Sequence, residues 1–398
     1  MGEARWHRWS LRDRLRMVRR LRGLVAERGA DIAACVPRDA AETLVAEVLP
    51  LAEACSFLER EAEELLAPRR LGKGRPLWLS GTTLEVRREA LGTVLVIGPA
   101  NYPILLPGVH ALQALVAGNR VLVKPGVGGS RAMQLFAALL KESGLPAGAL
   151  RVLGEDPEEA QNAIEAGVDK VVLTGSNATG LAVMRVLAEH GTPSVMELSG
   201  CDSVFVLGDA DLDMVAAAVR FGLRLNGGNT CIAPKRIYVA RERAAGLGQR
   251  LSDCSIPVLA VDSMEEAAEL ASSCGFGLGA SVFGSEDAAW RIAALIRAGV
   301  VVINDMIVPT ADPRLPFGGR GKSGFGVTRG AEGLLEMTAL KAVCVRSGRW
   351  RPHFEPSRRG DTEMFRGVLL ALHAGSWKRR LEGILQVSRA GFARRKAA

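Results

Sequence analysis

The feature that most constrains the fold is an alternation, from about Thr93 onward, of short β-branched runs with Ala- and Leu-rich stretches. The runs are continuously apolar, as expected of strands that are covered on both faces. They are TVLVIG (93–98), VLVKP (121–125), KVVLTG (170–175), SVFVLG (203–208), RIYVA (236–240), IPVLAV (256–261) and VVVIND (300–305). Stretches such as 130–140 and 211–225 lie between them and are typical of helices. This order predicts an α/β fold built on parallel sheet.

Both ends of the chain differ from the alternating body. Apolar residues between Leu11 and Leu21 recur at helical spacing, which predicts a basic amphipathic helix rather than a secretory signal. The body ends near Val345, after which prolines and glycines predict an irregular connector, and residues 362–395 have a helical, basic pattern. No uncharged apolar run reaches the length of about 18 residues that a membrane-spanning helix needs.

The net charge of +8 is concentrated in the tail. From Arg346 to the end there are 13 Lys and Arg against 4 Asp and Glu, so the rest of the chain is close to neutral. This distribution argues against a nucleic-acid-binding protein. The seven cysteines are scattered and form no CxxC pair, which argues against a disulfide framework and a zinc site. We therefore expect no metal, no nucleic-acid partner and a reducing, cytoplasmic location.

Two residues stand out as candidates for catalysis. Cys231 ends the segment NGGNTC, where two glycines let the backbone turn sharply and present N–H groups to the oxyanion of a thiohemiacetal. The alternative is a small buried hydrophobe, the common role of a free cysteine. Glu197, in MELSG, has apolar neighbours that raise the pKa of a carboxyl and suit it to general-base chemistry. Its alternative is an ordinary surface or N-cap glutamate.

Two further segments favour phosphate or ribose binding. TGSNATG at 174–180 joins a strand to a helix, where backbone N–H groups and the helix dipole attract a phosphate. Its spacing is not the GxGxxG fingerprint, and many strand-to-helix turns contain glycine. Lys124, at the end of VLVKP, is either a ribose or phosphate ligand or a solvated strand-end lysine.

In chain order these segments resemble the aldehyde dehydrogenase superfamily. IGPANYP around Asn101 is similar to the family's segment whose asparagine amide holds the substrate oxyanion, and LVKPG around Lys124 is similar to its ribose-binding strand end. MELSG and GGNTC resemble the segments of the general base and the nucleophile. LGASVF at 278–283 and LPFGGRGKSGFG at 315–326 match later signatures. The resemblance covers most of the chain and is nearest to the short class that includes the fatty and aromatic aldehyde enzymes.

The resemblance implies an aldehyde dehydrogenase-like α/β fold, with a Rossmann-type cofactor domain, a truncated α/β catalytic domain and a C-terminal arm. We expect the N-terminal helices and the dinucleotide-binding domain at 1–199 and the shortened catalytic domain at 200–319. A return to the cofactor domain, or a bridging arm, is expected at 320–345, followed by the basic tail at 346–398. The family also implies a homodimer.

The reaction implied is the oxidation of an aldehyde to a carboxylic acid with NAD or NADP. In it Cys231 is the nucleophile that carries a thiohemiacetal and then a thioester, Asn101 holds the oxyanion, and Glu197 activates water. The residues implied for cofactor binding are Pro99, Lys124, Gly175, Ser176 and Gly180.

The sequence departs from the family pattern after the cysteine segment. Several helices and strands usually precede an E-x-F-G-P-V motif, but here DCSIPV follows Cys231 closely. Asp253 and Ser255 then stand where a ribose-binding glutamate and an aromatic residue are expected. Val127 replaces the glutamate that usually follows the lysine, so a 2′-phosphate meets no repulsion there and NADP is as acceptable as NAD. The missing elements also expose apolar surface, which an oligomer partner or the tail would cover.

Two hypotheses about function follow. In the first the chain is an active enzyme, because Asn101, Glu197 and Cys231 persist together. In the second it is a degenerate, catalytically impaired member that acts as a binding or structural partner. The tail also has two interpretations: its apolar residues from Met364 to Leu372, followed by WKRR, either contact anionic lipid as a peripheral membrane helix or pack on a neighbouring subunit.

Overall fold

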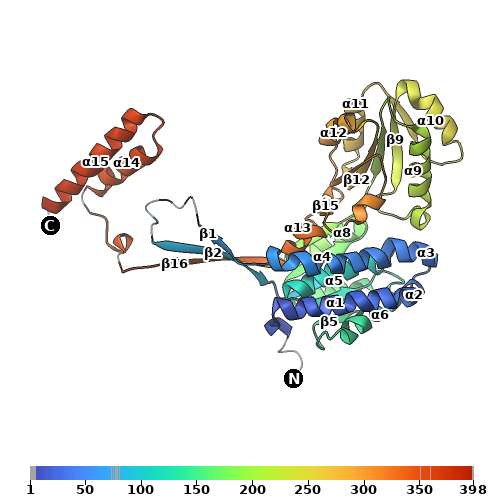
Figure 1. Cartoon of the computed structure of the whole chain (residues 1–398), viewed down its shortest axis with the longest axis horizontal. Coiled ribbons are helices and arrows are strands. Elements are labelled where there is room, and N and C mark those ends of the chain that lie inside the picture. The colour runs from blue at the N-terminus through green and yellow to red at the C-terminus, as the bar shows by residue number, and fades with distance from the viewer. Residues whose placement is uncertain are drawn as a thin grey trace. The chain divides into compact units, whose positions relative to one another are not determined.

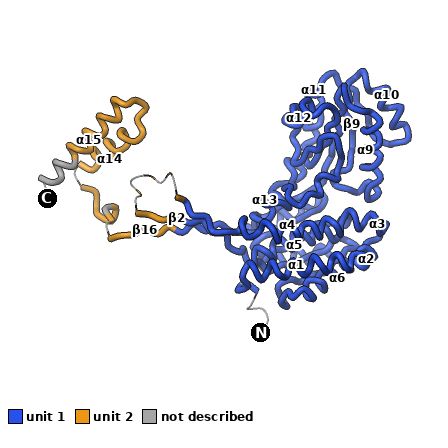
Figure 2. The backbone as a smooth tube through the Cα atoms, viewed as in Figure 1, with its two compact units in different colours: residues 1–71, 84–343 blue, residues 72–83, 344–398 orange. Residues whose placement is uncertain are grey.

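The computed structural model of the chain describes residues 6–72, 74, 76, 79, 81–349, 351–358 and 360–396. The side chains of residues 391–396, which include the last basic cluster of the tail, lie outside the described part. The chain divides into two compact units (Figure 2): Met1–Leu71 with Leu84–Val343, and Gly72–Thr83 with Cys344–Ala398. The first unit holds both large sheets and therefore every candidate site residue.

The predicted alternation forms two sheets of mainly parallel strands, which confirms the α/β fold class (Figure 1). The larger sheet has the order β15-β7-β6-β3-β4-β5. Its strands are β3 (Thr93–Ile97), β4 (Arg120–Lys124), β5 (Leu150–Val152), β6 (Lys170–Thr174), β7 (Ser194–Glu197) and β15 (Gly324–Phe325). All pairs are parallel except the pairing of β15 with β7.

Helices cover both faces of this six-stranded sheet, which explains why its strands are apolar at consecutive positions. Val94 and Val96 belong to one core cluster, whereas Leu95 and Ile97 belong to another. The connecting helices are α5 (Leu105–Ala117), α6 (Ser130–Glu142), α7 (Pro157–Glu165) and α8 (Asn177–His190). Every residue of α5 is buried, so this helix is apolar all round.

The second sheet has five parallel strands in the order β10-β9-β8-β12-β13. They are β8 (Asp202–Val206), β9 (Pro234–Ala240), β10 (Val258–Val261), β12 (Gly279–Phe283) and β13 (Val300–Ile303). In Figure 1, α9 (Leu212–Arg224) and α10 (Ala244–Arg250) lie on one side of this sheet, and α11 (Met264–Ser273) and α12 (Glu286–Leu295) on the other. β9 runs directly into α10 and β10, so the chain returns to the sheet immediately after the cysteine segment.

The N-terminal helices pack against the six-stranded sheet through α5. They are α1 (Leu11–Glu27), α2 (Gly29–Ala33), α3 (Ala40–Thr43) and α4 (Leu49–Leu65), with a π-helical turn at Leu44–Val48. Ser10 caps α1 by accepting the N–H of Asp13 at 3.2 Å, and the apolar residues predicted to line one face, such as Val18 and Leu21, are buried.

Short elements complete the first unit and lead out of it. β1 (Arg69–Leu71), β2 (Thr82–Ala90) and β16 (Thr338–Arg346) form a three-stranded sheet, and β11 (Phe276–Gly277) pairs with β14 (Arg320–Gly321). The helix α13 (Gly330–Glu336) lies between β15 and β16 in the chain.

The tail forms a hairpin of two helices, α14 (Asp361–His373) and α15 (Trp377–Lys396). The helical pattern predicted for 362–395 is therefore interrupted at residues 374–376. Gly367 lets the helices approach closely, because a Cβ there would lie 2.9 Å from the carbonyl oxygen of Gly383. Among the described residues no helix is long and apolar enough to cross a membrane.

Candidate functional site

Cys231 lies in a tightly turned loop between α9 and β9. The turn needs left-handed backbone at Asn226 (φ 52°) and Gly227 (φ 58°), which explains the Asn-Gly-Gly sequence. The backbone N–H of Asn226 donates to the carboxylate of Glu42 at 2.8 Å, and its side-chain amide donates to the carbonyl of Asn101 at 2.8 Å. These bonds fix the loop before the cysteine is reached.

The segment that follows β3 is joined to the same loop. The side-chain amide of Asn101 donates to the carbonyl of Asn229 at 2.6 Å, and the hydroxyl of Tyr102 is 2.7 Å from that of Thr230. Asn101 and Cys231 both line one cleft, as the sequence predicts. One hydrogen of the Asn101 amide is used by the loop, and a primary amide carries a second one.

Glu197 is the last residue of β7 and is only 2% exposed. Its Oε2 accepts a hydrogen bond from the hydroxyl of Thr328 at 3.0 Å, whereas Oε1 has no partner among the described residues. Burial raises the pKa of the Glu197 carboxyl, and the nearby charge of Arg329 and the Thr328 hydrogen bond offset part of the effect. One oxygen is thus free to receive a proton.

Arg329 is a buried cation beside this pair, and the sequence patterns do not reveal it. Its backbone is left-handed (φ 58°), its Nη1 donates to the carbonyl of Thr310 at 2.7 Å, and its guanidinium lies 4.3 Å from the centre of the Phe317 ring. Its Nε has no partner among the described residues. The positive charge favours the ionised forms of both Glu197 and Cys231.

The surroundings of the Cys231 thiol disfavour its ionisation. Burial raises the pKa of this thiol, the negative charges of Glu197 and Asp202 raise it further, and Arg329 lowers it in part.

Two cavities meet at Cys231. The first, of about 490 Å³, is called the polar cleft because Asn101, Lys124 and the start of α8 line it, and the second, an apolar cavity of about 440 Å³, is lined by residues such as Val45 and Phe221. The residues that line both are Leu106, Glu197, Thr230 and Cys231. A substrate in the apolar cavity and a second reactant in the polar cleft would thus approach the same sulfur.

The polar cleft contains four of the five residues predicted for cofactor binding, namely Pro99, Lys124, Gly175 and Ser176. Ser176 caps α8 by accepting the N–H of Thr179 at 3.0 Å. Gly180 has a different position. A Cβ there would lie 2.5 Å from the Leu198 side chain, so this glycine allows close helix packing instead of forming the cleft wall.

A carboxylate that the sequence patterns do not indicate lies near Lys124. Glu155 accepts the backbone N–H groups of Gly128 and Ser130, each at 2.8 Å, at the start of α6. These backbone hydrogen bonds lower the pKa of Glu155, so it is ionised, and its charge acts on Lys124. A negative charge is therefore present close to exposed Val127, although position 127 itself carries none.

The shortened segment after the cysteine does not bring a carboxylate to the cleft. Asp253 pairs with Arg220 through two hydrogen bonds of 2.9 and 3.0 Å and lies outside the cleft lining. Lys235, four residues after Cys231, lines the cleft instead. The residue pattern of CIAPK gives no reason to single out Lys235.

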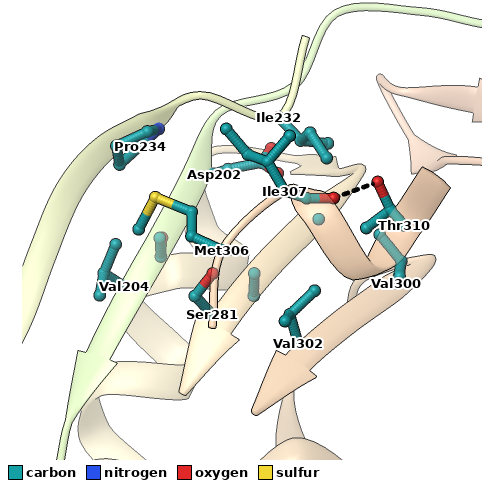
Figure 3. Close-up of a pocket in the computed structure, with 13 residues that line it drawn as sticks. Asp202, Val204, Ile232, Pro234, Ser281, Val300, Val302, Met306, Ile307 and Thr310 are labelled. Atoms are coloured by element: carbon teal, nitrogen blue, oxygen red, sulfur yellow. Dashed lines mark hydrogen bonds between the residues drawn. The ribbon is translucent and has the colours of Figure 1, made fainter. Parts of the chain in front are cut away.

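Figure 3 shows a small cavity next to Ile232, the residue after the nucleophile. Asp202 lies on its wall and is buried. Burial raises the pKa of Asp202 well above its usual range, and a backbone hydrogen bond from Gly279 offsets part of the effect. The cavity measures about 10 Å³, which is room for a single water molecule. It therefore offers no site for an organic ligand.

Comparisons with known proteins agree with this geometry. The model of the aldehyde dehydrogenase family matches residues 2–254 and 256–343. A 4,4′-diapolycopene aldehyde oxidase of Methylomonas sp is 28% identical over 405 aligned positions, and the alignment covers 82% of this chain and 76% of that protein. Aldehyde dehydrogenase family 3 member A2 of Rattus norvegicus is 30% identical over 247 residues, 61% of this chain but only 50% of that protein.

A solved structure extends the likeness to the fold. The NAD⁺ complex of an aldehyde dehydrogenase from Bacillus cereus superposes with a TM-score of 0.80 at 22% sequence identity. The superposition covers 86% of this chain and 85% of that one. The six-stranded and five-stranded sheets thus have the same arrangement as in that fold.

Proposed function

The chain belongs to the aldehyde dehydrogenase family of NAD(P)-dependent enzymes, and we propose that it oxidises apolar aldehydes to carboxylic acids through a thioester on Cys231. The observation that carries this proposal is the meeting of the polar cleft and the apolar cavity at Cys231 and Glu197. The cleft suits a dinucleotide, since it offers Lys124 at a strand end and the capped N-terminus of α8. When bound, the cofactor supplies the hydride acceptor.

The first step is attack by the nucleophile. Glu197 takes the proton of the Cys231 thiol, the sulfur bonds to the aldehyde carbon, and the carbonyl oxygen receives an electron pair as an oxyanion. The second amide hydrogen of Asn101 stabilises that oxyanion. Arg329 favours the negative charge while it resides on the sulfur or on the carboxylate.

Loss of hydride from the thiohemiacetal leaves a thioester on Cys231. Glu197 first releases to solvent the proton that it took from the thiol. It then takes a proton from water, the hydroxide attacks the acyl carbon, the carbon–sulfur bond breaks with its electron pair on the sulfur, and the thiolate regains a proton from Glu197 as the acid leaves. Oε1 of Glu197, which has no partner among the described residues, is the oxygen suited to receive each proton.

The substrate class follows from the apolar cavity. Its walls include Phe221, Ile307 and Phe317, and its only charged lining residues among those described are Glu42, Arg329 and the base itself. Apolar aldehydes gain free energy by burying hydrocarbon there, whereas a charged side group would lose its hydration. We propose that hydrophobic aldehydes are preferred over small polar ones.

A single-turnover measurement tests the function. Protein, NAD or NADP and a hydrophobic aldehyde are mixed, and the absorbance of reduced cofactor is followed. We expect a burst in the native chain, no burst in Cys231→Ser, and a slower burst without further turnover in Glu197→Gln, because that variant lacks the base for both steps. Folded protein that reduces no cofactor with a broad aldehyde panel would support the impaired-member hypothesis, for which the displaced Asp253 is the favouring observation.

We propose that the protein is a cytoplasmic homodimer with domains at 1–199, 200–319, 320–345 and 346–398. For the tail, exposed apolar residues on both helices, such as Phe365 and Leu381, support contact with a neighbouring subunit or with anionic lipid. Light scattering distinguishes dimer from monomer. Sedimentation with anionic vesicles at low salt decides between the tail's two partners, because a purely intersubunit arm would leave the chain in the supernatant.

A further inference from the structure

Two cysteines outside the catalytic machinery lie side by side in the five-stranded half of the first unit. Cys201 is in the connection between β7 and β8, and Cys274 is the C-cap of α11. The two thiols are close enough to shift each other's pKa, and both residues are partly exposed. This pair cannot be recognised from the sequence, because 72 residues lie between the two positions.

An arginine is held against one of the two sulfurs. Nη2 of Arg236 lies 3.1 Å from the sulfur of Cys274. The guanidinium is fixed in place, since its Nε donates to the hydroxyl of Ser203 at 2.9 Å and its Nη2 also donates to the carbonyl of Ala271 at 2.8 Å. A fixed cation next to a partly exposed thiol is the environment that promotes thiolate formation.

The contact with Arg236 favours ionisation of Cys274. Burial opposes it, but the hydrogen bond with the Phe276 backbone and the one from Arg236 lower the pKa of this thiol. Burial raises the pKa of Cys201, and the adjacent Cys274 raises it further. By contrast, burial raises the pKa of Cys55 to about 12, as expected of an inert core cysteine.

We propose that Cys201 and Cys274 form a peroxide-reactive dithiol that closes to a disulfide, with Cys274 as the attacking residue and Cys201 as the resolving one. Thiol pairs of this kind suit a reducing compartment, where disulfides are transient and redox-sensing rather than structural. The assignment is independent of aldehyde oxidation, since neither sulfur lines the polar cleft or the apolar cavity.

The chemistry needs hydrogen peroxide as oxidant. The Cys274 thiolate attacks one peroxide oxygen, so that a sulfur–oxygen bond forms, the oxygen–oxygen bond breaks, and the departing hydroxide takes a proton to become water. Cys201 then loses its proton and attacks the sulfur of Cys274. The sulfur–sulfur bond forms, the sulfur–oxygen bond breaks, and a second water leaves. Two thiols are oxidised and one peroxide is reduced.

The position of the pair connects it to the nucleophile. Gly200 immediately precedes Cys201, and a Cβ on it would lie 2.6 Å from the carbonyl oxygen of Cys231. Gly200 and Ser199 also line the polar cleft. A covalent link at Cys201 therefore restrains the segment that packs against the catalytic loop.

Mass spectrometry of the full chain tests the proposal. The Cys231→Ser background removes the catalytic thiol, so that the result does not depend on enzyme activity. After brief peroxide treatment and alkylation of free thiols, we expect a peptide pair linked through Cys201 and Cys274, which dithiothreitol releases. In the added variant Cys201→Ser, Cys274 should instead accumulate as a sulfenic acid that dimedone traps.

Two controls make the outcome decisive. Cys254→Ser should leave the cross-link unchanged, whereas Arg236→Gln should slow its formation by about tenfold, since the thiolate loses its cation. Circular dichroism verifies that each variant is folded. Absence of the Cys201–Cys274 link from folded, peroxide-treated protein would overturn the proposal, and so would oxidation spread evenly over the remaining cysteines.

Discussion

Replacing Glu47 with alanine should destabilise the fold more than any other change at a single carboxylate of the N-terminal helices. Glu47 lies in the π-helical turn before α4 and is fully buried. Its carboxylate accepts the backbone N–H groups of Ile104 and Leu105, at 2.9 and 3.0 Å, and it forms a buried ion pair with Arg38. It therefore satisfies the N-terminus of α5, the central helix of the unit.

The magnitude follows from what the alanine leaves behind. Two buried N–H groups lose their acceptor, at about 1–3 kcal/mol each. Arg38 loses this buried partner but keeps an ion pair of 3.9 Å with Glu42, so its contribution stays below the roughly 3–5 kcal/mol of a buried pair broken outright. Because burial already raises the pKa of Glu47 and weakens its ionised form, we expect the lower part of the combined range, about 3–4 kcal/mol.

Urea unfolding followed by circular dichroism measures the effect, with Glu53→Ala as the matched control. Glu53 is exposed on α4, so its removal should change the free energy of unfolding by less than about 0.5 kcal/mol. Activity should fall too, since Arg38 lies over the ring of Tyr102, whose hydroxyl contacts the catalytic loop at Thr230. A loss below about 1 kcal/mol for Glu47→Ala would refute this reasoning.

Three other changes have defined outcomes. Because burial raises the pKa of Glu197, the rate of thioester hydrolysis in single-turnover experiments should increase with pH, with a midpoint above 4.5, the ordinary glutamate value. A flat pH profile would contradict the role of Glu197 as base. Gly200→Ala should lower the free energy of unfolding by about 1–3 kcal/mol and reduce kcat, since its methyl meets the carbonyl of Cys231. Gly23→Ala, with open space around it, should not destabilise α1. Equal melting temperatures of the two variants would contradict this. Glu155→Gln should raise kcat/KM for NADP relative to NAD by about tenfold, or 1.4 kcal/mol, because a 2′-phosphate near Lys124 would no longer face the charge of Glu155. The same change at an exposed glutamate of α7 should leave this ratio unaltered.

The sequence was sufficient for the strands and for the grouping of three candidate site residues in one cleft. Continuous apolar runs identify strands covered on both faces, and all seven predicted runs are strands within a few residues of the expected bounds. Asn101, Glu197 and Cys231 were expected in one site, and they line one cleft. Asn101 follows β3, Glu197 ends β7 and Cys231 precedes β9. Local patterns suffice wherever function depends on strand ends.

Features that depend on contacts between distant segments could not be predicted. Arg329 reaches the base only because the chain returns along β15, and Glu155 approaches Lys124 from the end of the neighbouring strand β5. Position 127 carries no carboxylate, and the negative charge near Lys124 comes from Glu155, which lies elsewhere in the sequence. The break between α14 and α15 was also missed, since residues 374–376 contain only one glycine to signal it.

The division of the site between two sheets has a consequence for how the protein matures. Glu197 ends a strand of the six-stranded sheet, whereas Cys231 precedes a strand of the five-stranded sheet. Each sheet has its own core, but neither one alone holds both the acid–base group and the nucleophile. During refolding, we therefore expect backbone structure to recover before activity. The reason is that the two sheets, each with its own core, must pack against one another before the first turnover. Newly made chains would thus pass through a compact but inert stage, in which the reactive thiol is still separated from its base.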